Sequence, residues 1–196
     1  MVSRDFYTQY TEIFLEENSK LNLISKNDEK FLWEKHIYDS LAIGKVFEKY
    51  GKPGNLLDIG TGGGFPAIPV ALAYPDIKVT AVDSIAKKIR AVQTIIKKLE
   101  LKNLTAVCSR IENLSGQYDI VVSRAVSSLK NICKYALPKL KKGGYFAAYK
   151  SRKAPDEIKE TYHILKKHNA QIIDIIEYSL PLAKSPVRNI VVIGQN

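Results

Sequence analysis

Residues 58–66 read Asp58-Ile59-Gly60-Thr61-Gly62-Gly63-Gly64-Phe65-Pro66, an acidic residue followed by a glycine-rich turn. The apolar segment 55–59 predicts a short buried strand, and residues 66–74 predict a helix that opens at Pro66. A strand, a glycine-rich turn and a helix in this order bring backbone N–H groups close to a ligand, because glycine has no Cβ to block the approach. The stretch therefore predicts an α/β fold with a ligand site at the turn.

Outward from this turn, strand and helix patterns alternate along the chain. Strands are predicted at 55–59, 77–82, 104–108, 118–123, 144–149, 170–178 and 188–193, and helices at 66–74, 85–101, 129–139 and 156–167. Repeated units of this length predict a mainly parallel, seven-stranded sheet with helices on both faces and right-handed crossovers. Only the turn 180–187 separates the last two strands, which predicts a C-terminal antiparallel hairpin.

The first fifty residues have a helical period and are predicted to form a leader that packs on the sheet. One predicted helix buries Phe6, Tyr10, Ile13, Phe14 and Glu17, and a second runs from 30 to 50 with inward residues Trp33, Ile37, Leu41, Ile43 and Val46. In the predicted helix 85–101, the inward residues are Ile85, Ile89, Val92, Ile96 and Leu99. We predict a single domain, 1–196, with the leader at 1–50 and the α/β core at 54–196.

The glycine-rich turn predicts which cofactor binds there. An acid, Asp83, ends the following strand 19 residues after Gly64, where its carboxylate can accept hydrogen bonds from ribose hydroxyls. A dinucleotide site needs a third glycine at the position that Phe65 occupies. Asp58 would also repel a pyrophosphate, whereas it suits the ammonium group of a methionine moiety. S-adenosylmethionine is therefore favoured over NAD, and a purely structural turn is the remaining alternative.

The charge distribution indicates a polyanionic partner. The chain carries a net charge of +10, of which residues 84–110 contribute +6 and residues 130–153 contribute +8, while residues 1–50 sum to −2. Clustered cations gain affinity for nucleic acid by releasing counterions from phosphates, although a solubilising surface is the alternative interpretation. No apolar run spans a bilayer, and no His, Cys or Asp cluster has metal-ligand spacing. Cys108 and Cys133 are expected to be reduced and buried, in a cytosolic monomer that binds neither membrane nor metal.

Several further motifs carry a resemblance to a known family. They are Leu21-Asn22-Leu23, His36-x-x-Asp39-Ser40-Leu41, the stretch 58–66, Asp83-Ser84 with Lys87-Lys88-x-Arg90, Ser109-Arg110-x-Glu112, Tyr118-Asp119, Ser123-Arg124-Ala125 and Lys150. In this order they closely resemble the bacterial 16S rRNA guanine-N7 methyltransferases, also called the glucose-inhibited division protein B family. The resemblance runs from about residue 21 to 193. Two positions depart from the family pattern, since Ala67 and Ser151 stand where the family often has glycine.

The resemblance implies a Rossmann-like class I methyltransferase that acts on guanine N7 in 16S rRNA of the small ribosomal subunit. The cofactor-binding residues expected from sequence and resemblance together are Asp58, Gly60, Gly62, Gly64, Phe65, Asp83, Ser84, Ile111, Glu112 and Arg124. The predicted catalytic residues are Arg124, His36 and Asp39. The predicted RNA contacts are Lys87, Lys88, Arg90, Lys97, Lys98 and Lys150. Glu112 is equally well explained as a helix-capping acid.

The chemistry of guanine N7 fits this set of residues. N7 carries a lone pair, so attack on a sulfonium methyl group needs alignment and no general base. We hypothesise that Arg124, at the end of a strand, orients the base through O6 or a phosphate; an ion pair with Asp58 or Asp39 is the alternative. His36 is predicted to bond Asp39 or a phosphate, or else to pack structurally. Two other functions stay open: methylation of another RNA site or a small molecule, and a non-catalytic nucleotide-binding module.

Overall fold

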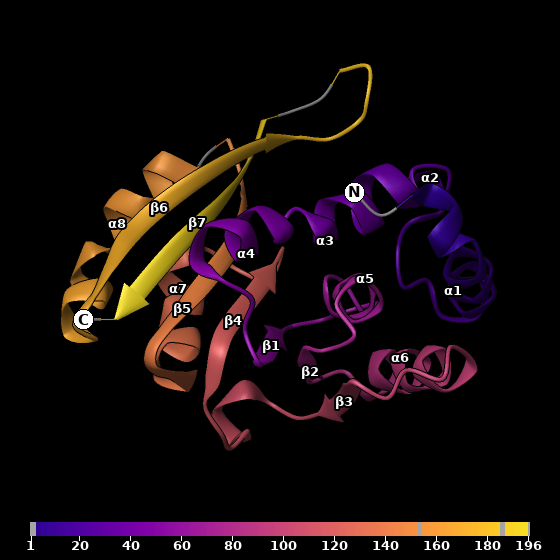
Figure 1. Ribbon diagram of the computed structural model, residues 1–196, viewed down its shortest axis with the longest axis horizontal. Coiled ribbons are helices and arrows are strands. Elements are labelled where there is room, and N and C mark those ends of the chain that lie inside the picture. The colour runs from indigo at the N-terminus through magenta and orange to yellow at the C-terminus, as the bar shows by residue number, and fades with distance from the viewer. Residues whose placement is uncertain (1–2, 153, 185–186, 196) are drawn as a thin grey trace.

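A seven-stranded sheet forms the centre of the protein. The computed structural model describes residues 3–152, 154–184 and 187–195. The strands are β1 Asn55–Ile59, β2 Lys78–Asp83, β3 Leu104–Cys108, β4 Tyr118–Arg124, β5 Leu140–Ser151, β6 Ala170–Ser179 and β7 Val187–Gln195. They lie in the order β3-β2-β1-β4-β5-β7-β6 (Figure 1). β1 to β5 are parallel, and β7 is antiparallel to both β5 and β6, which confirms the predicted sheet and hairpin.

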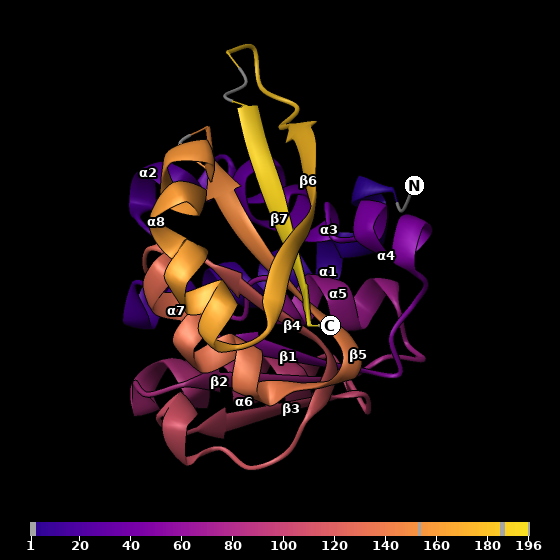
Figure 2. The same ribbon diagram turned by 90° about the vertical axis from the view of Figure 1, so that its left-hand side faces the viewer.

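Helices cover both faces of the sheet (Figures 1 and 2). The core helices are α5 Ala67–Ala73, α6 Ala86–Lys98, α7 Leu129–Ala136 and α8 Ala154–Lys167, with short 3-10 turns η3 Ile111–Asn113 and η4 Leu137–Lys139. One hydrophobic cluster joins α5, α6 and the leader to the first face, and a second joins α7 and α8 to the other. β3 is followed by the 3-10 turn η3 before the chain enters β4.

The N-terminal leader packs on the face that carries α5. Its elements are η1 Arg4–Tyr7, α1 Thr8–Leu21, α2 Lys26–Glu29, the π-helix η2 Trp33–Tyr38, α3 Asp39–Leu41 and α4 Gly44–Tyr50. The predicted single helix over 30–50 is therefore wrong, because a π-helical turn and a break at residues 42–43 divide it. Phe6 was also predicted to face inward but is 53% exposed, whereas Tyr7 is fully buried. The 3-10 geometry of η1 shifts the phase of the apolar face by one residue.

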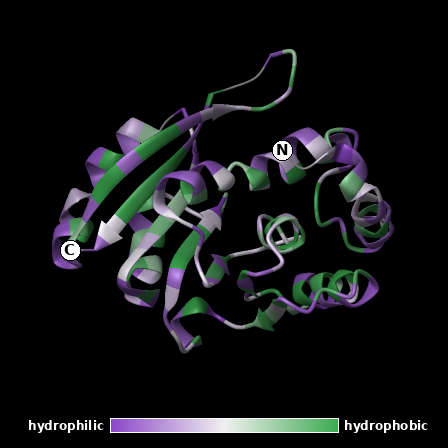
Figure 3. Cartoon of the chain, in the orientation of Figure 1, coloured by the Kyte–Doolittle hydropathy of each residue, from purple (hydrophilic) through white to green (hydrophobic). Residues whose placement is uncertain are grey.

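Helix α6 begins one residue later than its apolar pattern predicts. Ile85 has an extended conformation before the helix and is 41% exposed, so its predicted burial is wrong. Ile89, Val92 and Ile95 form the buried face. Figure 3 shows hydrophobic residues along one side of α6 and hydrophilic residues along the other. The exposed lysine-bearing side therefore faces solvent, as the sequence predicts.

The strand order reverses between β1 and β4, which lie side by side at the middle of the sheet. β1 connects to β2 on one side, and β4 connects to β5 on the other. In open α/β sheets, ligands bind at the carboxyl ends of the strands at such a reversal. The glycine-rich turn after β1 and Arg124 at the end of β4 both lie at this point.

Two properties bear on membranes and on redox state. Within residues 3–152, 154–184 and 187–195, no helix combines the length and apolarity that a membrane span requires. Both cysteines are free thiols. Cys133 is buried as predicted, but Cys108, the last residue of β3, is exposed, so its predicted burial is wrong.

Candidate active site

The glycine-rich turn after β1 takes left-handed backbone conformations that favour glycine. Gly60, Gly62 and Gly64 have φ angles of 73°, 58° and 94°. A Cβ on Gly60 would meet Val126 at 2.4 Å, and one on Gly64 would meet Ile68 at 2.4 Å. Gly60 is therefore required by the loop that follows β4, and Gly64 by close packing of the turn on helix α5.

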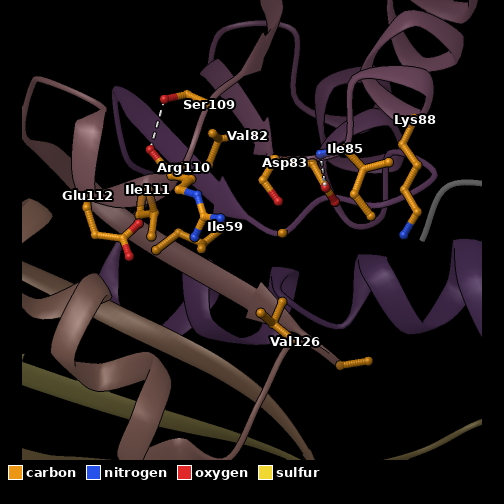
Figure 4. Close-up of a pocket in the computed structure, with 13 residues that line it drawn as sticks. Ile59, Val82, Asp83, Ile85, Lys88, Ser109, Arg110, Ile111, Glu112 and Val126 are labelled. Carbon is orange, nitrogen blue, oxygen red and sulfur yellow. Dashed lines mark hydrogen bonds between the residues drawn. The ribbon is translucent and has the colours of Figure 1, made fainter.

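A cavity of about 400 Å³ opens beside this turn. Its lining residues are Ile59, Gly60, Val82, Asp83, Ser84, Ile85, Lys88, Ser109, Arg110, Ile111, Glu112, Ala125 and Val126. Figure 4 shows the residues around Asp83 on one side and those from Ser109 to Glu112 on the other, with Val126 between them. We call this space the cofactor cavity.

Asp83 occupies the position at the end of β2 where an acid was predicted. Its Oδ2 accepts a hydrogen bond from the Gly62 N–H at 3.0 Å, and its Oδ1 accepts one from the Ile85 N–H at 2.9 Å. A carboxylate offers about four lone-pair positions, so two remain for further donors. The backbone therefore fixes the carboxylate while leaving it able to accept hydrogen bonds from a ribose.

Half of the predicted cofactor residues line this cavity: Gly60, Asp83, Ser84, Ile111 and Glu112. Gly62, Gly64, Phe65, Asp58 and Arg124 lie outside its lining. Gly62 contributes indirectly, because its N–H donates a hydrogen bond that fixes the carboxylate of Asp83. Sequence reasoning missed Val82, Ile85 and Val126 as lining residues, because apolar residues at strand ends carry no motif of their own.

Asp58 lies beneath the glycine-rich turn and is fully buried. Its Oδ2 accepts a hydrogen bond from the Ala67 N–H at 3.3 Å, while its Oδ1 bonds to no described residue. Burial raises the pKa of Asp58 to about 7, because the charged form is poorly solvated there. In this geometry Asp58 supports the start of α5, and its contact with an ammonium group stays a prediction.

A second cavity, of about 560 Å³, lies at the ends of β4 and β5. Its lining residues are Asp28, Lys35, His36, Asp39, Arg124, Ala125, Ser127, Tyr149, Lys150, Ser151, Glu157, Tyr178 and Arg188. It contains all three predicted catalytic residues, drawn from the leader and from β4. We call it the substrate cavity.

Arg124 is held in place by several groups. Its Nη1 donates to Asp39 Oδ2 at 2.9 Å and to the Lys35 carbonyl at 3.0 Å, and its guanidinium carbon lies 5.2 Å from the centre of the Phe65 ring. The alternative interpretation of Arg124, an ion pair with Asp39, is therefore the one that the structure contains. Phe65 packs under this guanidinium, and its predicted contact with a cofactor stays a prediction.

His36 contacts the same guanidinium. Its Nδ1 lies 3.1 Å from Arg124 Nη2, and since a guanidinium only donates, Nδ1 accepts and the proton lies on Nε2. Burial and the neighbouring Arg124 charge lower the pKa of His36 to about 4, so the ring is neutral. Its Nε2 is buried and bonds to no residue in the described part of the chain. His36 thus fixes Arg124 and has no free lone pair with which to act as a base.

The two cavities meet at Ala125, which lines both. Ala125 directly follows Arg124 and has a φ of 55°, a left-handed conformation that is strained for a residue with a Cβ. This turn directs Arg124 into the substrate cavity and Val126 into the cofactor cavity. A group transferred between ligands in the two cavities would pass beside Ala125.

Lys150 lies in the wall of the substrate cavity rather than on an open surface. Its Nζ donates to Glu157 at 2.8 Å and to the Ser127 carbonyl at 2.8 Å, and its side chain is only 10% exposed. Glu157 also accepts a hydrogen bond from the Leu129 N–H at 2.6 Å. In this arrangement Lys150 anchors the loop 125–128, which differs from the predicted role of an open RNA contact.

The predicted lysine face on α6 is only partly free. Lys87, Arg90 and Lys97 are exposed, whereas Lys88 lines the cofactor cavity. Lys98 bonds Glu16 at 2.7 Å and Glu17 at 3.3 Å, which ties α6 to α1. The three exposed cations keep their predicted surface position, and Lys98 is committed to an intramolecular ion pair.

No group of three or more His, Cys, Asp or Glu side chains in the described ranges has a geometry that could hold a metal ion.

Solved structures share the architecture of this chain. The N-methyltransferase NodS of Bradyrhizobium japonicum, in complex with S-adenosyl-L-homocysteine, superposes with a TM-score of 0.64 at 14% identity, covering 94% of this chain and 99% of that chain. A ribosomal protein L11 methylase of Lactobacillus delbrueckii gives a TM-score of 0.60 at 15% identity, covering 80% and 77%. At such identities the likeness concerns the fold, which is that of the Rossmann-like class I methyltransferases.

The family follows from sequence comparison. A family model described as rRNA small subunit methyltransferase G matches residues 5–190. The ribosomal RNA small subunit methyltransferase G of Lachnoclostridium phytofermentans is 38% identical over 88% of this chain and 73% of the relative. That of Chlorobium phaeobacteroides is 42% identical over 77% and 68%. The chain belongs to the rRNA small subunit methyltransferase G family, which confirms the resemblance drawn from the motifs.

Proposed function

We propose that this chain transfers a methyl group from S-adenosylmethionine to N7 of a guanine in 16S rRNA of the small ribosomal subunit. Family membership supports the reaction and the substrate. One observation on this chain carries the proposal: two cavities meet at Ala125. One cavity is lined by the carboxylate of Asp83, which is suited to bind a ribose, and the other by the guanidinium of Arg124.

The cofactor cavity fits S-adenosylmethionine in its chemistry. Asp83 would accept hydrogen bonds from the ribose hydroxyls, and the apolar side chains of Ile85 and Ile111 would cover the two faces of the adenine. Glu112 lies beside Ile111 and would accept a hydrogen bond from the adenine amino group. When bound, this cofactor supplies a methyl group on a positively charged sulfur, which is a strong electrophile.

The substrate cavity fits the recognition of guanine. Three donors of the Arg124 guanidinium are used by Asp39, the Lys35 carbonyl and His36, so two of its five N–H groups remain. Arginine recognises guanine through the O6 and N7 acceptors. We propose that the remaining donors of Arg124 bind O6 or a phosphate, because N7 must stay free to react. Asp39 and His36 are then positioning residues for Arg124.

The proposed mechanism depends on alignment alone. Guanine N7 already carries the attacking lone pair, and the neutral His36 is occupied by Arg124, so the chain need not remove a proton. Holding two reactants in line contributes about 7–11 kcal/mol toward lowering the barrier when the geometry is good. Arg124, half-buried and packed against Phe65, would supply such alignment from the side of the substrate.

Methyl transfer from labelled S-adenosylmethionine to small subunits that lack their native modifications tests the proposal. We expect one N7-methylguanine in 16S rRNA by mass mapping. With Arg124→Ala, turnover should fall at least a hundredfold while cofactor affinity changes less than threefold, since Arg124 lies outside the cofactor cavity. Normal turnover by Arg124→Ala would refute its role, and labelling of another RNA or of no RNA would refute the substrate.

A further inference from the structure

The charged side chains of the substrate cavity are almost completely paired with one another. The three ion pairs are Lys35–Asp28 at 2.7 Å, Arg124–Asp39 at 2.9 Å and Lys150–Glu157 at 2.8 Å. The remaining titratable lining groups are His36, which is neutral, and the hydroxyls of Tyr149 and Tyr178. Arg188 is the seventh charge of the cavity, and no carboxylate of the described residues lies within ion-pair distance of it.

Arg188 lies at the start of β7, between two strands whose ends line the same cavity. In the sheet register it is opposite Ser151 of β5 and Tyr178 of β6. Its side chain is half-buried, and its Nε atom is buried without a hydrogen-bond partner among the described residues. Tyr178, its cross-strand neighbour, lines the same cavity.

An unpaired guanidinium donor in a buried position is unfavourable, because it has lost water without gaining an acceptor. The acceptor that suits its planar fork is a carboxylate or a phosphate. The three carboxylates that line the cavity are already paired with other cations, and the expected ligand, an RNA nucleotide, carries a phosphate. We propose that Arg188 binds the phosphate group of the nucleotide to be methylated. This inference rests on the proposed function and adds a second recognition site to it.

Arg124 and Arg188 would then hold a single nucleotide at two ends. Tyr178 connects them, since its hydroxyl donates to Asp39, which pairs with Arg124, and since Tyr178 is the cross-strand neighbour of Arg188. The cavity volume of about 560 Å³ lies within the usual range for sites that hold a molecule of this size. With the base at Arg124 and the phosphate at Arg188, rotation of the guanine about its glycosidic bond would be restricted.

The direct test compares guanosine 5′-monophosphate with guanosine as probes, by NMR titration of the full chain saturated with S-adenosylhomocysteine. We expect the monophosphate to bind about tenfold more tightly, as one charge-assisted contact to a phosphate would allow. Arg188→Gln should remove this difference, and Arg188→Lys should keep part of it. Lys166→Gln on α8 makes the same charge change on an exposed residue and should leave the difference intact.

Equal affinity of both probes for the wild-type chain, or a preference for the monophosphate that survives Arg188→Gln, would overturn the inference. Loss of S-adenosylhomocysteine binding in Arg188→Gln would also overturn it, because the anion would then be the cofactor carboxylate. Arg188 has no acid partner among the described residues, so the variant should unfold at the same temperature as the wild type. None of these readouts needs methyl transfer, so they remain informative even if ribosomal RNA proves not to be the substrate.

A second test uses small subunits as substrate. The logarithm of affinity falls as the logarithm of salt concentration rises, and each phosphate contact makes this fall steeper by roughly 0.7–0.9. The slope of log kcat/KM against log salt concentration should therefore be shallower by about this amount in Arg188→Gln and unchanged in Lys166→Gln. An unchanged slope in Arg188→Gln would contradict a phosphate contact.

Discussion

Removal of the Tyr178 hydroxyl is expected to destabilise the protein through the ion pair behind it. The hydroxyl donates a 2.7 Å hydrogen bond to Asp39 Oδ1, and Asp39 is only 3% exposed. Hydrogen bonds to charged groups contribute about 1.5–3 kcal/mol to stability. Water can reach Asp39 from the substrate cavity, so we expect a loss near the lower end, about 2 kcal/mol, for Tyr178→Phe. In a chain of this length that corresponds to about 4–8 °C in Tm.

Urea unfolding with an unchanged m value measures this loss. Tyr162→Phe is the matched control, because Tyr162 lies on α8, is 62% exposed and bonds to no described residue; it should change stability by less than about 0.5 kcal/mol. Tyr178→Phe combined with Asp39→Asn should cost less than the sum of the two single changes, since the first removes the Tyr178–Asp39 hydrogen bond and the second weakens the same bond by removing the charge of its acceptor. If Tyr178→Phe is as stable as Tyr162→Phe, Tyr178 does not support Asp39 and the reasoning is refuted.

Three further predictions concern charge. His36 has a pKa of about 4 when folded, below its ordinary 6.5, so wild-type stability should gain a component of about 3 kcal/mol as pH rises from 4 to 6.5, and His36→Asn should lack it in urea unfolding across this range. The pKa of Asp58 is raised to about 7, so its contribution has the opposite sign: stability is lost as pH rises from 3.8 to 7, and Asp58→Asn should remove that loss in the same assay. Lys97→Gln should reduce the salt dependence of RNA binding, whereas Lys98→Gln, whose cation is paired with Glu17, should leave it unchanged; the reverse result would contradict the assignment of the α6 surface.

Much of the fold could be predicted from the sequence because local patterns decide it. Strands β1 and β3 begin and end at the predicted residues, since each is an apolar run bounded by polar or turn-forming residues. The leader was less predictable. Its apolar period is helical throughout, but the exposure of Phe6 depends on how the leader packs against the sheet. The break within 30–50 depends on tertiary contacts as well, among them the hydrogen bond that the Lys35 carbonyl accepts from Arg124.

The sequence predicted which residues form the site, but it predicted only some of the contacts that those residues make. Arg124, His36 and Asp39 were assigned to one place, and they do lie together. Lys150 and Lys98 were assigned to RNA because they are cations in basic stretches, yet each meets a carboxylate that sequence position does not reveal. Charge alone shows that a residue needs a partner, and only the fold decides whether that partner is a carboxylate of the chain or a phosphate outside it.

In the proposed enzyme, the exposed cations and the paired cations therefore have different roles: the first attract RNA, and the second orient the bound nucleotide. Six of the seven charges in the substrate cavity cancel in pairs, so the cavity itself contributes little to the long-range pull on RNA. We assign that pull to exposed cations such as Lys87, Arg90 and Lys97 of α6, and it weakens with salt. The paired charges do something different: each carboxylate fixes a cation in one geometry, so the donors that remain on Arg124 are aimed before RNA arrives. Neutralising Asp39 should therefore reduce turnover more than RNA affinity, although Asp39→Asn raises the positive charge of the chain.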